Sequence, residues 1–396
     1  MLEKLDTVPW EQLRHAYAPA VDVPDLIRLL AEGDEEEREQ ATGDLHGNIF
    51  HQGTRYEATP HAVPFLIELL STDKQPDKDK IAYLLVSLAM GYEDDFLPEG
   101  FDPILFRQQC EKTDAEMSPE KRAACKELAS GPLLDVACYD AVEKGVPAFL
   151  LLLEDQDPKV RRAGAYALSW FPSKASVSIP KLLDLEVKQM EVATDVVVFL
   201  ALGLLIRTQP QKDGDESTLQ AKEKLTSALR SKGSLQLRAA AAIALAGQSD
   251  SPLVNDVLLE ATMSPDQLQE WRDDIRFNGG NLSGYVALTL AHGDPTARDR
   301  VVHALCETLK CVNPYESIDV TRSLLELLVA ERATWIKEIP PEDLTPLEAE
   351  ALTAIATHGG WEIDGAIFTN YCQIVRAFGV PDSQEELLAY LGNRES

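Results

Sequence analysis

Residues 45–70, LHGNIFHQGTRYEATPHAVPFLIELL, gather side chains of the types that do chemistry around the start of a helical run. Two histidines, His46 and His51, are the residues that would bind a metal or exchange protons. They are five positions apart, whereas two ligands on one helix face are normally four apart, so a metal site or acid–base catalysis is not favoured. We expect a structural role for the cluster, with partner binding as the alternative. The candidate contact residues are His51, Gln52, Arg55, Tyr56 and Glu57.

Two further clusters combine an aromatic ring with carboxylates, a composition suited to contacts with arginine or lysine of a protein partner. Each is equally compatible with a solvated loop that tucks one residue into the core. The candidate residues are Tyr92, Glu93, Asp94, Asp95 and Phe96 in the first cluster, and Trp271, Asp273 and Asp274 in the second.

The sequence lacks the motifs of common enzymes. It contains no GxxxxGK[ST], no GxGxxG after a strand and no GxSxG, so phosphate-binding loops and a nucleophile elbow are not indicated. Six cysteines lie far apart with no CxxC pair, which favours reduced, buried thiols over disulfides or a zinc site. We therefore predict a non-enzymatic protein with no catalytic residues, no metal and no cofactor.

The charge balance excludes one class of partner. The 396 residues include 66 acidic and 37 basic side chains, which gives a formal charge of −29. Such a chain repels a phosphate backbone, so we predict that it has no nucleic-acid partner. An acidic surface can simply serve solubility. The alternative is that it speeds the docking of a basic protein partner.

Membrane and export signals are not found in the sequence. No run approaches the roughly 18 apolar residues of a membrane helix, and the start, MLEKLDTVPW, has neither the apolar stretch nor the cleavage site of a signal peptide. We predict no membrane contact and a cytoplasmic location.

Four segments repeat one pattern that begins with a β-branched residue and a proline. Apolar residues follow two, three and five positions after each proline, which is one face of a helix. Matching positions farther along each segment predict a second helix behind a short turn. Because no alternation typical of strands competes with this pattern, we predict an all-α protein. The four prolines are Pro24, Pro64, Pro147 and Pro180.

The spacing of these prolines predicts the domain organisation. The intervals are 40, 83 and 33 residues, so the long interval equals about two units, one of them degraded or carrying an insertion at 91–117. We expect a single array over residues 1–396. Its repeats are best defined at 22–90 and 145–247, with weaker repeats and a C-terminal cap over 251–396.

Local signals place helix ends within the first units. Asp22 is a candidate N-cap for the first helix, and Thr59 for the helix that follows the polar cluster. Gly53 is expected to end the intervening helix in the left-handed conformation. The core face of that helix, with residues spaced by four, is predicted to carry Ala41, Leu45 and Ile49.

Residues 154–168, EDQDPKVRRAGAYAL, resemble the turn and second helix of a HEAT repeat. Asp155 and Arg161 stand at the positions of that family's aspartate and arginine, and Glu32 and Arg38 have the same offset. The resemblance implies an armadillo-like α-solenoid, a superhelical stack of helix pairs whose extended concave face binds proteins.

The stretch 47–66 also resembles a recurrent N-terminal segment of bacterial HEAT-repeat proteins, through GNI, HQGTRYEA and AVPFL. Such proteins are similar to immunity or accessory proteins found beside secreted toxins. The resemblance implies a protein that binds and neutralises a basic toxin domain through its acidic surface. A general protein–protein adaptor is the alternative. A HEAT-type DNA glycosylase or a lyase is a third, and a glycosylase would need a basic concave cleft.

Overall fold

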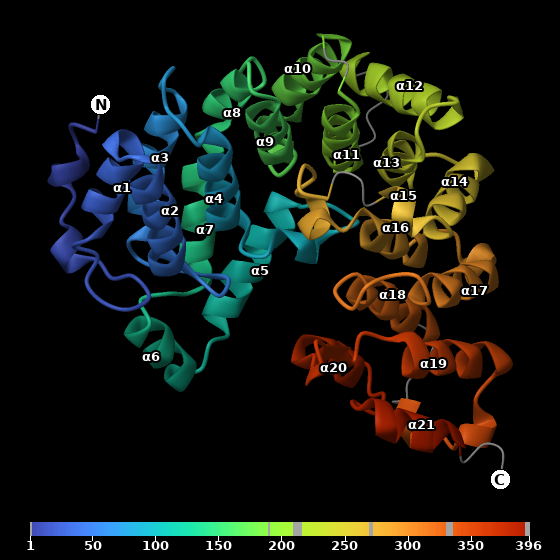
Figure 1. The fold of residues 1–396 in the computed structure, drawn as a ribbon. Coiled ribbons are helices and arrows are strands. Elements are labelled where there is room, and N and C mark those ends of the chain that lie inside the picture. The colour runs from blue at the N-terminus through green and yellow to red at the C-terminus, as the bar shows by residue number, and fades with distance from the viewer. Residues whose placement is uncertain (1, 189–190, 209–215, 269–271, 330–335, 393–396) are drawn as a thin grey trace. The chain divides into compact units, whose positions relative to one another are not determined.

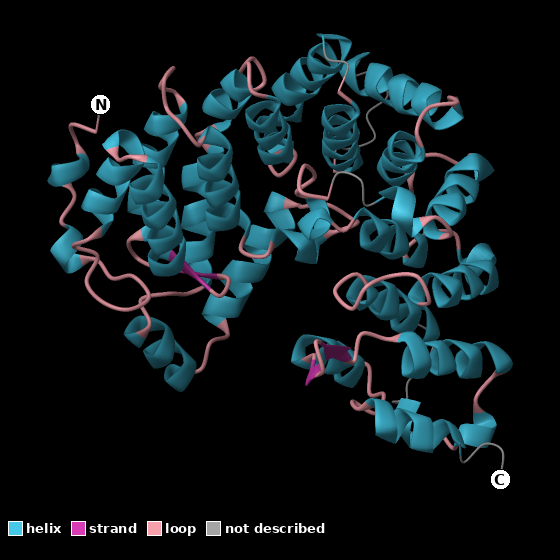
Figure 2. Cartoon of the chain, viewed as in Figure 1, coloured by secondary structure: helices cyan, strands magenta, loops and turns pink. Residues whose placement is uncertain are grey.

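The computed structural model describes residues 2–188, 191–208, 216–268, 272–329 and 336–392, and helices make up nearly all of its regular structure. Figure 1 shows the helices in chain order, and Figure 2 shows that strands are confined to short hairpins. The prediction of an all-α protein is confirmed. None of the described helices is both long and apolar enough to cross a lipid bilayer.

The chain forms two compact units, residues 1–221 and 222–396. The boundary between them falls within helix α12 (Glu216–Arg230). The single array predicted over residues 1–396 stays a prediction.

Unit 1 alternates helices with short connections. In chain order its elements are η1 (Leu5–Thr7), η2 (Trp10–Gln12), α1 (Val23–Glu32), α2 (Glu35–Ile49), β1 (Phe50–His51), β2 (Thr54–Arg55), α3 (Thr59–Leu70), α4 (Lys78–Met90), η3 (Glu93–Phe96), α5 (Pro103–Ala115), α6 (Pro119–Glu127), α7 (Pro132–Glu143), α8 (Val146–Leu152), α9 (Pro158–Leu168), η4 (Pro172–Lys174), α10 (Ala175–Lys188) and α11 (Val192–Arg207).

The helices of unit 1 pack in pairs and in two layers. α1 packs on α2, α3 on α4, α8 on α9 and α10 on α11. In one layer α2, α4, α9 and α11 follow one another, and in the other α1, α3 and α8 do so. Helix α7 packs against α3, α4 and α5. The predicted insertion at 91–117 contains η3, which packs on α4, and α5, which packs on α7.

The proline-led helices of unit 1 bury part of the predicted apolar stripe, since the third position after the proline is only half-buried in α3, α8 and α10. The second residue after the proline is fully buried in α3, α8 and α10, as Leu66, Phe149 and Leu182. In α1 the buried position is Ile27, one residue later, while Leu26 is half-buried. The core face predicted for α2 is confirmed, because all three of its residues are completely buried: Ala41, Leu45 and Ile49.

The two N-caps predicted in unit 1, Asp22 and Thr59, are both wrong. Thr59 is the first residue of α3 and follows Ala58, where no side chain caps the helix, and its hydroxyl donates to the Ile49 carbonyl instead. Helix α2 begins with a capping box, in which the Glu37 amide donates to Asp34 (3.0 Å) and the Asp34 amide donates to Glu37 (2.9 Å). Asp22 precedes α1 but caps nothing. Its two carboxylate oxygens instead contact the ring of His15 (3.0 Å) and the amide of Asn48 (2.8 Å), so the predicted cap is wrong.

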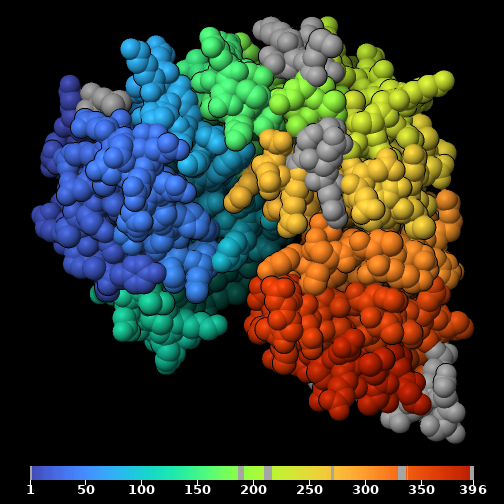
Figure 3. Space-filling model, in the orientation of Figure 1, coloured from blue at the N-terminus to red at the C-terminus, as the bar shows by residue number. Residues whose placement is uncertain are grey.

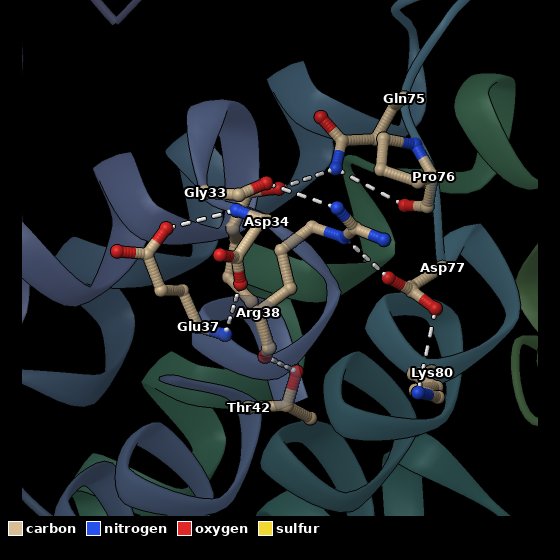
Figure 4. Close-up of polar contacts among 10 residues, drawn as sticks. Gly33, Asp34, Glu37, Arg38, Thr42, Gln75, Pro76, Asp77 and Lys80 are labelled. Atoms are coloured by element: carbon tan, nitrogen blue, oxygen red, sulfur yellow. Dashed lines mark hydrogen bonds and ion pairs between the residues drawn. The ribbon is translucent and has the colours of Figure 1, made fainter. Parts of the chain in front are cut away.

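Arg38 links the first helix pair to the second. Its Nε lies 2.7 Å from Asp77 Oδ2, just before α4, and its Nη1 donates to the Gly33 carbonyl at 2.9 Å (Figure 4). Beside this pair, the buried Gln75 amide donates to the Leu30 carbonyl at 2.7 Å. The turn before α4 is therefore attached to the first pair by both an ion pair and a buried hydrogen bond.

The same kind of link recurs twice along unit 1. Lys78 Nζ lies 3.6 Å from Asp155 Oδ2 in the turn before α9, and Arg162 Nη1 lies 3.0 Å from Glu191 Oε2 just before α11. Arg161, beside Arg162, donates from Nη1 to two carbonyls of the turn before α9. We name the three ion pairs Arg38–Asp77, Lys78–Asp155 and Arg162–Glu191 the charge ladder.

Unit 2 continues the alternation of helices. Its elements after α12 are α13 (Leu235–Leu245), α14 (Pro252–Thr262), α15 (Pro265–Leu268), η5 (Phe277–Gly280), α16 (Leu282–Ala291), η6 (Pro295–Ala297), α17 (Arg298–Leu309), α18 (Ser317–Val329), η7 (Ile336–Glu338), η8 (Pro341–Asp343), α19 (Pro346–His358), β3 (Glu362–Ile363), β4 (Ala366–Ile367), α20 (Thr369–Ala377) and α21 (Gln384–Gly392).

The helices of unit 2 also form two layers. α13, α16, α18 and α20 follow one another in one layer, and α14, α17, α19 and α21 in the other. Figure 3 shows that the surface of α19–α21 (red) continues that of α17 and α18 (orange). Near the end, Trp361 is buried, donates from Nε1 to the Ile355 carbonyl at 2.9 Å, and lies edge-on to Tyr371. This aromatic pair belongs to the apolar core of unit 2, to which α21 adds the buried Leu387.

Candidate functional site

The polar stretch after α2 folds as a tight hairpin. Strands β1 and β2 are antiparallel, with Phe50 opposite Arg55 and His51 opposite Thr54. The two turn residues, Gln52 (φ 48°) and Gly53 (φ 82°), are both left-handed, as a two-residue type I′ turn requires. Helix α2 ends at Ile49, so the prediction that Gly53 ends this helix is wrong, although its left-handed conformation was expected.

Arg55 anchors the hairpin from beneath. Its side chain is buried, with Nη1 donating to the Gly53 carbonyl at 2.9 Å and Nη2 lying 3.0 Å from Asp135 Oδ1 on α7. Burial raises the pKa of Asp135, and the positive charge of Arg55 opposes that rise. The ion pair therefore fixes the hairpin to a helix eighty residues farther along the chain.

Tyr56 and Glu57 tie the end of the hairpin to the rest of unit 1. The Tyr56 amide donates to the Thr59 hydroxyl at 2.8 Å, and that hydroxyl donates to the Ile49 carbonyl at 2.7 Å. The Glu57 amide donates to the Ala129 carbonyl at 3.0 Å. Arg55 and Tyr56 are thus buried supports. Of the residues proposed for this stretch, Gln52 and Glu57 are exposed and His51 is half-exposed.

The N-terminal loop adds a residue that sequence reasoning missed. Tyr17 is 65% exposed, and its hydroxyl lies 3.1 Å from His51 Nδ1, with the two rings edge to face. The Tyr17 amide donates to His15 Nδ1, which leaves His15 Nε2 to donate to Asp22. Tyr17 had no signal in the sequence beyond its aromatic type, because the hairpin that it contacts is thirty-four residues away.

Tyr92 reaches the hairpin from its other side. Its ring is 56% exposed, lies edge-on to the buried Phe50 at 6.3 Å, and passes so close to Gly53 that a Cβ there would be 2.7 Å from it. Two of the three predicted clusters, 51–57 and 92–96, therefore meet in the structure. We name the surface formed by Tyr17, His46, His51, Gln52 and Tyr92 the hairpin face.

In the rest of the 92–96 cluster, some side chains make internal contacts and others lie on the surface. Glu93 accepts a hydrogen bond from the Tyr166 hydroxyl at 2.6 Å, and Phe96 packs edge-on against the buried Phe101 at 4.9 Å. Asp94 is half-buried and Asp95 is exposed. One or two carboxylates therefore accompany the exposed Tyr92 ring.

The third predicted cluster belongs to unit 2. Trp271 lies outside the described residues. Asp273 is exposed and Asp274 is half-exposed, and the neighbouring Arg272 has its Nη1 3.8 Å from the buried Glu316.

No metal centre is evident in the described part of the chain, where three or more His, Cys, Asp or Glu side chains do not gather in a suitable arrangement. His46 lies edge-on to Phe50 at 5.0 Å, whereas His51 faces Tyr17, so the two histidines contact different neighbours. The hairpin face presents exposed rings, an amide and nearby carboxylates on a hairpin fixed by Arg55.

Comparisons with known proteins do not place the chain in a family. No family model matches it, and no curated protein does. Among solved structures, the chain is similar to an engineered protein whose crystal structure came from a structural genomics consortium. The identity is 16% and the TM-score 0.28, over 95% of this chain and 99% of that one. A likeness of this degree carries no argument about function.

Proposed function

We propose that the protein is a non-catalytic, protein-binding scaffold of HEAT-like helix pairs, stacked as an α-solenoid. Three observations support the solenoid: paired helices, two layers in each unit, and the charge ladder, which links each pair of unit 1 to the next. In such stacks each repeat contacts only its neighbours, so loops and surface residues are free to vary for binding.

The hairpin face is the main support for a binding function. Tyr17 and Tyr92 are more than half exposed, yet each is held by an aromatic neighbour and by a hairpin fixed through Arg55. When a partner binds, exposed tyrosines on a rigid frame bury a large area and lose little side-chain entropy. Tyrosine is enriched at protein interfaces for this reason.

The charge of the chain supports a basic partner. A formal charge of −29, with Asp94 and Asp95 beside Tyr92, favours a basic protein surface. The sharpest form of the proposal is a bacterial, cytoplasmic immunity protein that neutralises a basic toxin domain by covering the groove with which that domain binds nucleic acid.

A general adaptor is the second candidate, and a separate aromatic surface favours it. In unit 2 the exposed Tyr315 lies edge-on to the half-buried Phe368 at 5.3 Å. An adaptor that bridges two proteins would use this surface as well as the hairpin face.

The immunity proposal predicts that a gene for a basic toxin domain lies beside this one, and co-expression of the two proteins tests it. We expect the chain to restore growth, and Tyr92→Ala to reduce that rescue and weaken binding about tenfold or more, because loss of an aromatic anchor costs about 2 kcal/mol. Tyr315→Ala, at a similarly exposed tyrosine, is the matched control and should leave rescue intact. Absence of rescue by the parent chain would refute the immunity function. Binding that does not weaken as salt rises would refute the role of charge.

A further inference from the structure

A cavity of about 470 Å³ lies in unit 2 between the end of α16, the start of α17, the end of α18 and the residue just after α20. Its apolar lining includes Leu290 and Val301, which are buried, and Leu327 and Phe378, which are half-buried. This volume falls in the range of about 300–1,000 Å³ that is usual for sites of small organic ligands.

Hydrogen bonds fix the walls of this cavity. The Arg298 guanidinium on α17 donates from Nε and Nη2 to the Leu327 carbonyl on α18, at 3.1 and 2.8 Å. Phe378 is held where α20 ends, because its amide donates to the Val375 carbonyl at 3.2 Å and the next residue, Gly379, is left-handed at φ 66°. The apolar walls are therefore in place before a ligand binds, which lowers the ordering cost of binding.

The charged side chains of α17 and α18 that line the cavity interact with the protein itself. Two N–H groups of Arg298 are used on the Leu327 carbonyl. Glu326 Oε1 accepts from Arg322 Nε at 3.0 Å, and Glu326 Oε2 is buried, so a molecule in the cavity does not reach it. The Glu326 carboxylate therefore belongs to the wall and does not select a ligand.

Two ionisable residues of the connection between α16 and α17, His292 and Asp294, are exposed at the cavity. Asp294 Oδ1 accepts from the Thr296 amide at 2.9 Å, and Asp294 Oδ2 accepts from the Thr296 hydroxyl at 2.8 Å. His292 donates from Nδ1 to the Leu288 carbonyl at 2.9 Å. Both residues thus have partners in the chain and also contact water.

The lining as a whole does not favour a charged ligand. Two carboxylates, one guanidinium and one imidazole line the cavity within the described part of the chain, so groups of both signs surround the space. An ammonium or carboxylate group that entered would lose hydration and would meet a charge of its own sign. An apolar group has no such loss and gains free energy when it is removed from water.

We propose that this cavity binds a small, uncharged, apolar organic molecule, which packs against Leu290, Val301 and Phe378. The site goes beyond the proposed function, because it lies in unit 2, whereas the hairpin face belongs to unit 1.

Titration calorimetry of the full chain with naphthalenemethanol, naphthalenemethylamine and naphthoate tests the site. The three probes share one ring system and are neutral, cationic and anionic at neutral pH. We expect the alcohol to bind about tenfold or more tightly than either charged probe, because a charged probe loses hydration without gaining a dedicated partner. No binding of the alcohol, or binding of a charged probe as tight as that of the alcohol, would overturn the proposal.

Two variants locate the binding. Ala291→Phe adds a ring to the lining at the end of α16, and Phe378→Ala removes the aromatic wall, so each should weaken binding of the alcohol about tenfold. Ala115→Phe, the same change at the exposed last residue of α5, is the matched control and should bind no differently from the parent. Melting temperatures near that of the parent show that a loss of binding is local. Parent-like affinity in either cavity variant would place the binding elsewhere and overturn the proposal.

Discussion

Arg38 of α2 and Asp77 of the turn before α4 form an ion pair, 2.7 Å from Nε to Oδ2, although thirty-nine residues separate them. Both side chains are less than a quarter exposed. Burial would raise the pKa of Asp77, but hydrogen bonds and charges from Arg38 and Lys80 outweigh it and lower the pKa. The pair therefore contributes to stability while Asp77 is ionised, and it joins the first helix pair to the second.

Arg38→Ala should destabilise unit 1 by about 1–3 kcal/mol at neutral pH, because it leaves a partly buried carboxylate without its main partner. Since the pKa of Asp77 is lowered on folding, this contribution is full above the ordinary aspartate pKa of 3.8 and is lost as the pH falls through the lower, folded value. Urea unfolding at pH 7 and at pH 3 measures both effects.

Arg28→Ala is the control for this prediction, because Arg28 pairs with two exposed carboxylates, Asp6 and Asp25, the latter at 2.7 Å. Exposed pairs are worth about 0–1 kcal/mol, so this variant should remain close to the parent. Equal destabilisation by the two variants would contradict a special role for the charge ladder.

Gly53→Ala tests the hairpin turn. A Cβ at Gly53 would require a left-handed alanine at φ 82° and would lie 2.7 Å from the Tyr92 ring, so we expect a loss of about 1–2 kcal/mol in stability. The displaced ring should also weaken partner binding. Gly43→Ala is the matched control: it lies within α2 with no atom near the new Cβ, so it should stabilise the helix by up to about 1 kcal/mol. Chemical unfolding of both variants gives the comparison.

The sequence predicted what depends on local periodicity. The apolar stripe after each proline and the burial of Ala41 and Leu45 follow from helical spacing, which needs no knowledge of distant residues. The glycine at position 53 was compatible with two local structures. A helix C-terminus and a type I′ turn both require a left-handed glycine, and only the pairing of β1 with β2 decides between them.

The hairpin face could not be predicted, because it depends on contacts between distant segments. Tyr17 meets His51, and Tyr92 meets Phe50, only after α1–α4 have packed. At Asp22, contacts between distant segments replaced a local interaction that the sequence favoured. A favourable local cap was lost because two better partners, one of them His15, were brought within reach by folding.

The Arg55–Asp135 pair predicts a non-additive pair of variants. Arg55→Met should destabilise unit 1 by about 2–4 kcal/mol, because it leaves Asp135 without its charge partner beside apolar surroundings. Arg55→Met combined with Asp135→Leu should recover part of that loss, since replacing both charges removes the unpaired carboxylate. A double-mutant cycle by urea unfolding measures the coupling, and purely additive losses would show that the pair does not act as a unit.

Asp195→Asn should make the protein more stable at neutral pH. Burial, with a smaller effect from Glu191 one turn earlier, raises the pKa of Asp195 to about 6, and its Oδ1 is buried without a hydrogen bond from the described residues. A carboxyl group whose pKa is higher in the folded than in the unfolded protein stabilises the fold while it is protonated, and this contribution is lost when it ionises. Stability should therefore fall as the pH rises from about 4 to 6 and then stay level.

The asparagine variant removes this dependence on pH. It should match the parent near pH 4 and exceed it by about 1 kcal/mol at pH 7, a value reduced for the partial exposure of Asp195. Asp184→Asn, an exposed aspartate on α10, is the control and should follow the pH profile of the parent. Melting temperatures recorded between pH 4 and pH 7 make the comparison. Parallel profiles for parent and Asp195→Asn would show that Asp195 is ionised at no cost in the folded protein.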